Sequence, residues 1–191
     1  MGSSPNVRRA LVGVSVVLAA FVIAAGLSGV ASAGRPSGVR AFLVGSGFLC
    51  GEEGACPDVS RADNGDTVEI AGDGTFNPAT RNATGSGTFV HHLADGTVFA
   101  HGTWDVVGLI SFKSFGTVDF DGTTIEGGLA LLRVAIHPSE FPGVTFSGVL
   151  TVDCLVGSAP AGADEGVRLN VQDTPFNFNT EVSGETLFLP Q

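Results

Sequence analysis

The chain has 191 residues with a net charge of −10, 28 glycines, 14 phenylalanines and no tyrosine. This acidity argues against nucleic acid or an anionic membrane surface as a partner, because the lysines and arginines that neutralise phosphates are few. The sequence contains no phosphate-binding loop, zinc knuckle or nucleophile elbow, so no motif identifies a reaction.

Residues 1–33 have the pattern of a secretory signal peptide: two arginines, an apolar run from Leu11 to Leu27, and an Ala-Ser-Ala ending. Cleavage after Ala33 would leave one domain, residues 34–191, with a charge of −12, because two basic and no acidic residues are removed. An uncleaved membrane anchor is the alternative, since the run is near the minimum of about 17 residues for crossing a bilayer. We expect a secreted, extracellular or cell-envelope protein that is free of the membrane after cleavage.

The remaining chain alternates β-branched and aromatic residues with polar ones between turn residues, and no stretch sustains a helical repeat, so we expect an all-β domain. Residues 51–66 and 157–166 are predicted as polar loops. Short connections favour a single antiparallel β-barrel-like domain over a β-sandwich, because consecutive strands can pair without long crossovers. The predicted strands are residues 39–49, 67–71, 84–94, 97–115, 117–121, 128–137, 144–156, 167–172 and 176–189, the last interrupted near Ser183 and Gly184.

Three cysteines fit an exported protein, in which disulfides persist. Cys50 and Cys56 bracket the short polar loop GEEGA, whose ends come within bridging distance, so we predict a disulfide between them. Cys154 lies on an apolar strand face and is predicted to be a buried thiol; a disulfide with Cys50 or Cys56 is the alternative.

The stretch GSGTFVHHLADGTVFAHGTW contains three of the four histidines and the only tryptophan. Asp95 and Gly96 are typical of a two-residue type I′ turn between two strands. With that turn, His92 opposes Phe99 across the hairpin. The register of the hairpin decides which histidines share a face.

In this register the three histidines do not form one cluster. His91 lies on an apolar face with Trp104, whereas His92 and His101 are diagonal neighbours on the other face. A diagonal pair can supply two ligands of a zinc or copper site, so His92 and His101 are the candidate metal ligands, and a third ligand would come from another segment. Ordinary surface histidines are the alternative.

The strand GGLALLRVAI has one purely apolar face and one mixed face that carries Arg133 and His137. We predict that the apolar face packs in the core, and that Arg133 and His137, with Lys113 from another strand, form a ligand-binding site. The alternatives for Arg133 are exposure or a salt bridge with Asp119 or Glu126.

These features favour a secreted, non-catalytic binding protein whose ligand is a small apolar or anionic molecule or a protein partner, with no cofactor. One alternative is an isomerase or cyclase on the same barrel, by analogy of fold class with dirigent and allene-oxide-cyclase proteins. Another is an extracellular structural protein that self-associates through its sheet edges.

Overall fold

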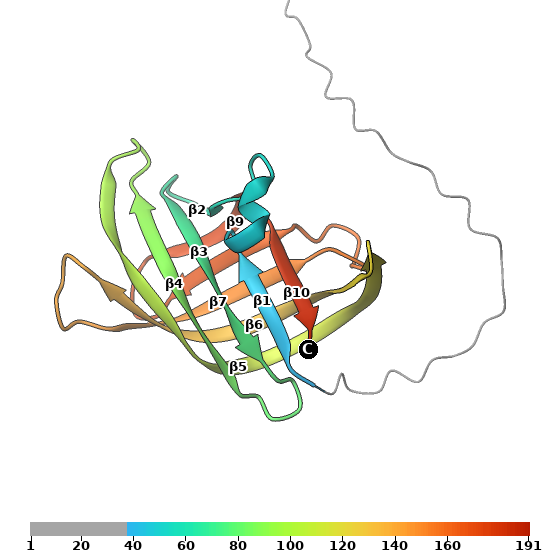
Figure 1. The fold of residues 1–191 in the computed structure, drawn as a ribbon. Coiled ribbons are helices and arrows are strands. Elements are labelled where there is room, and N and C mark those ends of the chain that lie inside the picture. The colour runs from blue at the N-terminus through green and yellow to red at the C-terminus, as the bar shows by residue number, and fades with distance from the viewer. Residues whose placement is uncertain (1–37) are drawn as a thin grey trace, which may run out of the picture. The chain divides into compact units, whose positions relative to one another are not determined.

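The computed structural model describes residues 38–191, which form a ten-stranded sheet that closes in a ring (Figure 1). All strand pairs are antiparallel, so the predicted all-β, barrel-like antiparallel fold is confirmed. The predicted signal peptide, residues 1–33, lies outside the described residues. Within the described part of the chain, no helix is long and apolar enough to cross a membrane.

The ring follows the order β1-β10-β6-β5-β4-β3-β2-β9-β8-β7, and the pairings β1–β3 and β6–β7 complete it. A short 3-10 helix, η1 (Gly47–Gly51), follows the first strand. The strands are β1 (Arg40–Val44), β2 (Asp58–Ala62), β3 (Thr67–Phe76), β4 (Ala83–His92), β5 (Val98–Phe120), β6 (Thr123–Pro138), β7 (Phe146–Cys154), β8 (Gly166–Val171), β9 (Asn177–Ser183) and β10 (Thr186–Pro190).

Strands β3 and β6 are longer than predicted, because β3 continues to Phe76 and β6 begins at Thr123. Strands β2 and β5 depart further from the prediction. The loop expected at residues 51–66 contains β2, whose inward positions are polar at Asp58 and Ser60, so the usual apolar alternation is missing there. Strand β5 continues without a break through the turn residue Gly116, where a shift in its register with β6 takes up the irregularity.

The two ends of the ring are closed by different strands, because β3 and β6 each pair with one strand along part of an edge and with another strand along the rest of that edge. Strand β3 pairs with β2 in its first half and with β1 from Gly72 to Phe76. Strand β6 pairs with β10 at Glu126 and with β7 from Gly128 to Ile136. The strands β1 and β10 therefore form a wedge at one end, and β2, β9, β8 and β7 close the other.

The inner face of the ring is a continuous hydrophobic core. The predicted apolar face of β6 lies inside it. Trp104 packs against Gly87, where an added Cβ would lie 2.6 Å from the indole ring, and its Nε1 donates a hydrogen bond to the carbonyl of Thr88 at 3.2 Å. Cys154 is buried and unpaired as predicted, and burial, with the nearby charge of Glu165, raises the pKa of its thiol to about 11.

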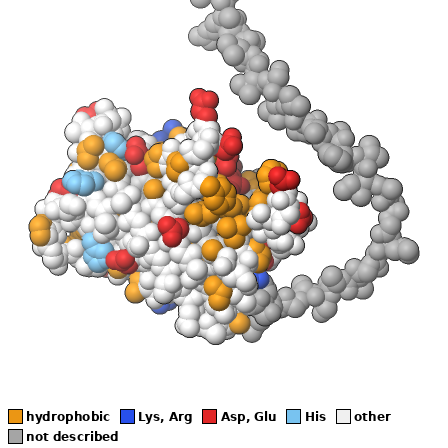
Figure 2. Space-filling view, viewed as in Figure 1, with side chains coloured by type: hydrophobic (Ala, Val, Ile, Leu, Met, Phe, Trp, Pro, Cys, Tyr) orange, Lys and Arg blue, Asp and Glu red, His pale blue; other side chains and the backbone are white. Residues whose placement is uncertain are grey.

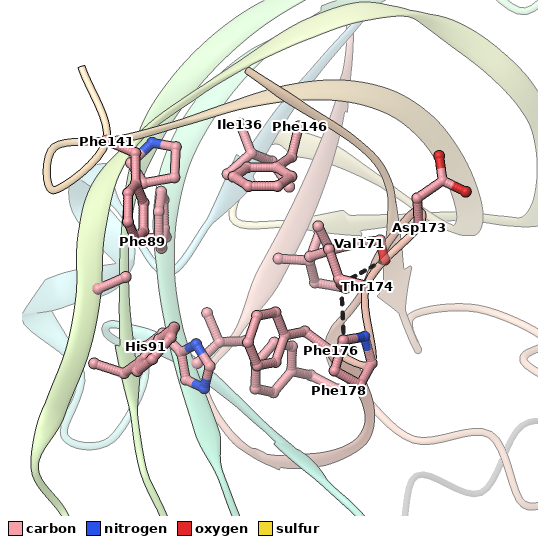
Figure 3. A pocket seen from close by; sticks show the side chains of 16 residues that line it. Phe89, His91, Ile136, Phe141, Phe146, Val171, Asp173, Thr174, Phe176 and Phe178 are labelled. Atoms are coloured by element: carbon pink, nitrogen blue, oxygen red, sulfur yellow. Dashed lines mark hydrogen bonds between the residues drawn. The ribbon is translucent and has the colours of Figure 1, made fainter. Parts of the chain in front are cut away.

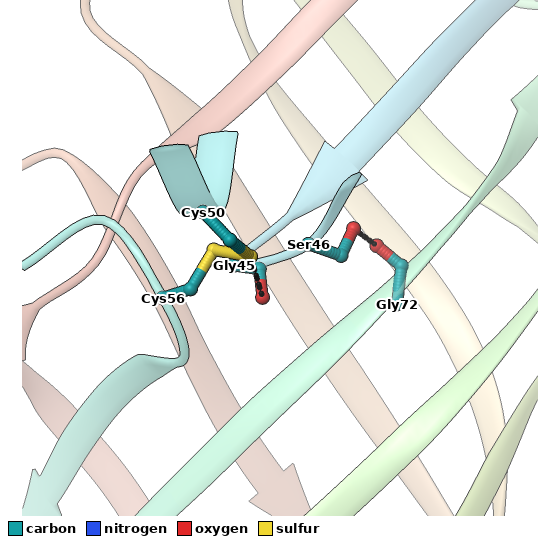
Figure 4. The surroundings of a disulfide bond; sticks show 5 residues. All are labelled: Gly45, Ser46, Cys50, Cys56 and Gly72. Carbon is teal, nitrogen blue, oxygen red and sulfur yellow. Dashed lines mark hydrogen bonds between the residues drawn. A yellow bond between two sulfur atoms is a disulfide. The ribbon is translucent and has the colours of Figure 1, made fainter. Parts of the chain in front are cut away.

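The predicted disulfide between Cys50 and Cys56 is present, with Cα atoms 5.1 Å apart (Figure 4). It closes the loop that contains η1, and Leu49 and Ala55 from this loop pack with Leu187 of β10 in a small second core. The loop therefore covers part of the outer face of the β1–β10 wedge.

Removing this disulfide in a Cys50→Ser/Cys56→Ser variant should lower the free energy of unfolding by about 2 kcal/mol, because the short loop restricts the unfolded chain only modestly. Urea unfolding followed by tryptophan fluorescence measures this loss, since the single Trp104 is buried. The wild type with a reductant should show the same drop, and the variant should not respond to the reductant. A variant as stable as the oxidised wild type would contradict the prediction.

Candidate functional site

An apolar cavity of about 300 Å³ lies at the end of the barrel away from the β1–β10 wedge (Figure 3). It reaches the surface, since Phe99 and Phe141 line it and are 42% and 48% exposed. Ala100 on β5 is the small inward residue that leaves space for it. Six phenylalanines line the cavity: Phe89, Phe99, Phe141, Phe146, Phe176 and Phe178.

The other end of the barrel is filled. Rings of Phe76, Phe112 and Phe188 pack with centroids 4.9 to 5.6 Å apart. Beside them Arg40 donates from Nε to Glu126 Oε2 at 2.8 Å, and both side chains are less than a tenth exposed. The interior is therefore solid at the wedge and hollow at the opposite end.

His91 is the buried polar side chain of the cavity, contributed by β4. Its Nε2 lies 3.2 Å from Oδ2 of Asp66, and both residues are 5% exposed. Burial raises the pKa of Asp66, but the hydrogen bonds of Asn64, His91 and the Ala94 amide outweigh it, and the pKa falls below its usual value. Asp66 is thus ionised at neutral pH and can only accept a hydrogen bond, so Nε2 of His91 is the donor of this pair.

Aromatic rings surround His91 on its remaining sides. The centroids of Phe99, Phe176 and Phe178 lie 5.0, 4.8 and 5.0 Å from the imidazole centroid, and Figure 3 shows His91 beside the last two. Among residues 38–191, no group forms a hydrogen bond with Nδ1. The second ring nitrogen is therefore available to a molecule in the cavity.

The turn between β4 and β5 differs from the predicted type I′ turn. Only Gly96 has a positive φ, 86°, and the amide of Leu93 donates to the carbonyl of Thr97, so the loop has three residues. A register shift follows, and His92 opposes Val98, which corrects the predicted pairing with Phe99. This irregularity lets Phe99 line the cavity although its neighbour Ala100 also points inward.

The two candidate metal ligands lie apart from the cavity, each with its own carboxylate. His92 Nε2 is 3.1 Å from Glu69, and His101 Nδ1 is 2.6 Å from Glu140. Figure 2 shows histidine and acidic side chains next to each other on the surface. In the part of the chain that the structure describes, no three histidine, cysteine or acidic side chains are placed to hold a metal ion.

The three predicted ligand-binding cations lie on the outer face of the barrel and do not meet. Arg133 is exposed, and exposed Lys113 lies over the ring of Phe115 at 5.8 Å. His137 pairs with Asp105 at 3.1 Å. Because the alternate residues of β6 fill the core, its odd-numbered residues point outward.

A buried acidic cluster was not predicted. Both carboxylate oxygens of Asp58 are buried without a hydrogen bond of good geometry, as are those of Glu181. Arg168 lies beside Glu181 at 3.5 Å and Asp153 at 3.3 Å. Asp58 belongs to the missed strand β2, so no alternation pointed to its burial.

Burial and neighbouring charges raise the pKa of the carboxyl groups in this cluster. Burial, then the charges of Glu165 and Glu181, raises the pKa of Asp58 to about 8, and the amides of Gly45 and Val167 offset this only in part. Burial also raises the pKa of Glu181 to about 7, although Arg168 lowers it.

Comparison of the chain with family models, curated proteins and solved structures found no match.

Proposed function

We propose that the protein is a secreted binding protein that holds a small apolar molecule in the cavity at the open end of its barrel. The observation that carries this proposal is the cavity itself, about 300 Å³ in volume and lined almost entirely by apolar side chains. Its volume is at the lower end of the range for small-molecule sites and corresponds to roughly ten heavy atoms. Within residues 38–191, each strand has a pairing partner on both sides, which leaves little free edge for a structural protein to self-associate through.

Naphthalene has ten heavy atoms and suits a cavity of phenylalanine rings. We expect a dissociation constant between about 1 µM and 1 mM, measured by NMR titration of the protein's amides. The largest shift changes should fall on residues that line the cavity. A titration that moves no amide of the cavity would contradict the proposal.

Filling the cavity should abolish this binding. Ala100 lines it and is 5% exposed, so an Ala100→Leu side chain occupies the space of the ligand. The affinity of the Ala100→Leu variant for naphthalene should fall at least tenfold. The variant Ala161→Leu, at an exposed position, should bind like the wild type. Trp104 fluorescence checks that both variants are folded. Equal affinity in Ala100→Leu and wild type would place the ligand elsewhere.

A second candidate function is an isomerase or cyclase on the same barrel, favoured by the His91–Asp66 pair. An imidazole held by an ionised carboxylate in a cavity sheltered from water has the arrangement of a general base. Liquid chromatography coupled to mass spectrometry of a molecule recovered from the protein separates the two functions, because isomers have the same mass but different retention times. A carrier returns its ligand unchanged, and an enzyme returns an isomer of the compound supplied.

A further inference from the structure

We infer that the cavity takes an apolar molecule that carries a carboxylic acid, and that Nδ1 of His91 binds the acid group; this inference rests on the proposed binding function. The argument begins with the polar groups of the cavity wall. Three polar side chains line it, those of His91, Asp173 and Thr174. Their hydrogen bonds decide which of them is available to a ligand.

Two of the three do not serve a ligand inside the cavity. Thr174 Oγ1 donates to the carbonyl of Val171 at 2.9 Å and accepts the amide of Phe176 at 3.2 Å. Asp173 is exposed at the rim, on the side of solvent. Among the described residues, this leaves Nδ1 of His91, a ring nitrogen without a hydrogen bond, as the polar side-chain atom of the cavity wall away from the rim.

The carboxylate of Asp66, which contacts His91, already accepts a hydrogen bond on each oxygen. Oδ2 of Asp66 pairs with Nε2 of His91, and Oδ1 accepts the amide of Ala94 at 3.0 Å. Among the described residues, a cationic ligand therefore finds no free carboxylate in the depth of the cavity to pair with its charge. A purely apolar ligand fits the walls but leaves Nδ1 buried without a partner, which reduces affinity.

A carboxylic acid satisfies Nδ1 by proton transfer. The O–H bond of the acid breaks, the proton moves to Nδ1, and the electron pair stays on the ligand, which becomes a carboxylate. The imidazolium then lies between two carboxylates, that of the ligand and that of Asp66, with a charge-assisted hydrogen bond to each. When the ligand enters already ionised, the same complex forms by uptake of one proton from solvent.

In the part of the chain that the structure describes, the acidic groups near His91 are Asp66 and Asp173. Asp66 faces the imidazole from the turn before β3, and Asp173 lies at the rim. Strands β5 and β9 and the segment before β9 present only the rings of Phe99, Phe178 and Phe176. The protonation of the complex is therefore set by His91, Asp66 and the ligand.

Isothermal titration calorimetry of the protein with naphthalene-2-carboxylate tests this inference. Heats in two buffers of different ionisation enthalpy, at about pH 8 where an ordinary histidine is neutral, give the number of protons taken up. We expect one proton per carboxylate bound, and an affinity that falls by up to tenfold per pH unit above this pH. Naphthalene should bind with pH-independent affinity.

The variant His91→Gln should lose the proton uptake and at least tenfold of the affinity for naphthalene-2-carboxylate, while its affinity for naphthalene stays within threefold. His101→Gln, which removes an exposed histidine, is the matched control and should behave like the wild type. If His91→Gln does not fold, the proton count of the wild type decides the question alone.

Three outcomes would overturn the inference. They are binding of the carboxylate without proton uptake, tighter binding of the cation naphthalen-2-ylmethylammonium, or tighter binding of 2-naphthol than of the carboxylate. Each of these leaves the proposed binding function intact. Failure of naphthalene itself to bind in the cavity overturns the proposed function instead.

Discussion

Raising the pH from about 5 to about 9 should lower the free energy of unfolding by several kcal/mol, because buried carboxyl groups are protonated in the folded protein and ionised in the unfolded chain. The pKa of Asp58 is about 8 in the fold against an ordinary 3.8, and that of Glu181 is about 7 against 4.5. At pH values between these limits the folded state binds more protons than the unfolded state, so stability falls as pH rises. For Asp58 alone the effect between about pH 5 and about pH 9 is on the order of 4 kcal/mol.

The packing around Asp58 explains why its pKa stays high. A Cβ added to Gly184 would lie 2.5 Å from Asp58 Oδ1, and one added to Gly166 would lie 2.8 Å from it. The backbone of these two glycines therefore lies closer to the carboxyl group than a larger residue would allow. Arg168 is engaged with Glu181 and Asp153, so it does not neutralise Asp58.

Urea unfolding at several pH values, followed by Trp104 fluorescence, measures this dependence. The neutral variant Asp58→Asn should show a smaller decline with pH and should be more stable than the wild type at about pH 9. Asp63→Asn, at an exposed aspartate, is the matched control and should retain the wild-type slope. Equal wild-type stability at about pH 5 and about pH 9 would refute the raised pKa values of this cluster.

Replacing Arg40 with methionine should cost about 3–5 kcal/mol of unfolding free energy, because it leaves the Glu126 carboxylate buried without its partner. The guanidinium also donates from Nη1 to the carbonyl of Gly38 at 2.7 Å, and its Cζ lies 5.9 Å from the ring centroid of Phe112. The ion pair is thus enclosed by the wedge and its aromatic cluster, where water does not replace the lost partner.

Urea unfolding at neutral pH checks this value against two further variants. The double variant Arg40→Met/Glu126→Gln should be more stable than Arg40→Met alone, because no charge is left unpaired. Arg133→Met, at an exposed arginine, should change stability by less than about 0.5 kcal/mol. A similar loss of unfolding free energy in Arg40→Met and Arg133→Met would contradict this prediction, because burial of the ion pair would then make no difference to stability.

Much of the strand framework could be predicted from alternation, because apolar residues recur at every second position along most of β6 and β7. Strand β2 could not, since it points Asp58 and Ser60 inward and lacks an apolar face. A buried salt bridge to Glu126 was considered for Arg133, but the partner is Arg40 on a strand of only five residues. That pairing depends on β10 bringing β1 next to β6, which no local pattern encodes.

Only part of the candidate site could be predicted from the sequence. Alternation placed His91 on the core side with Trp104, and a buried histidine needs a polar partner. The partner, Asp66, comes 25 residues earlier and reaches His91 through the pairing of Val68 with His91. Finding it requires the β3–β4 register, which depends on both strands together. The cavity could not be predicted either, because its volume depends on how much of one end of the barrel six aromatic side chains leave unfilled.

The pairing of β1 with β10 sets the order in which this protein is completed. Arg40 opposes Pro190, so the first and last strands of the ring are neighbours, and the amide of Gln191 donates to the carbonyl of Val39. During synthesis, a chain without β10 leaves β1 and β6 unjoined and the Phe42 and Phe76 side chains without their cover. Because this contact spans nearly the whole domain, it forms only after the last strand has been made. Closure of the barrel therefore requires β10, and the cavity is enclosed only when the ring is complete.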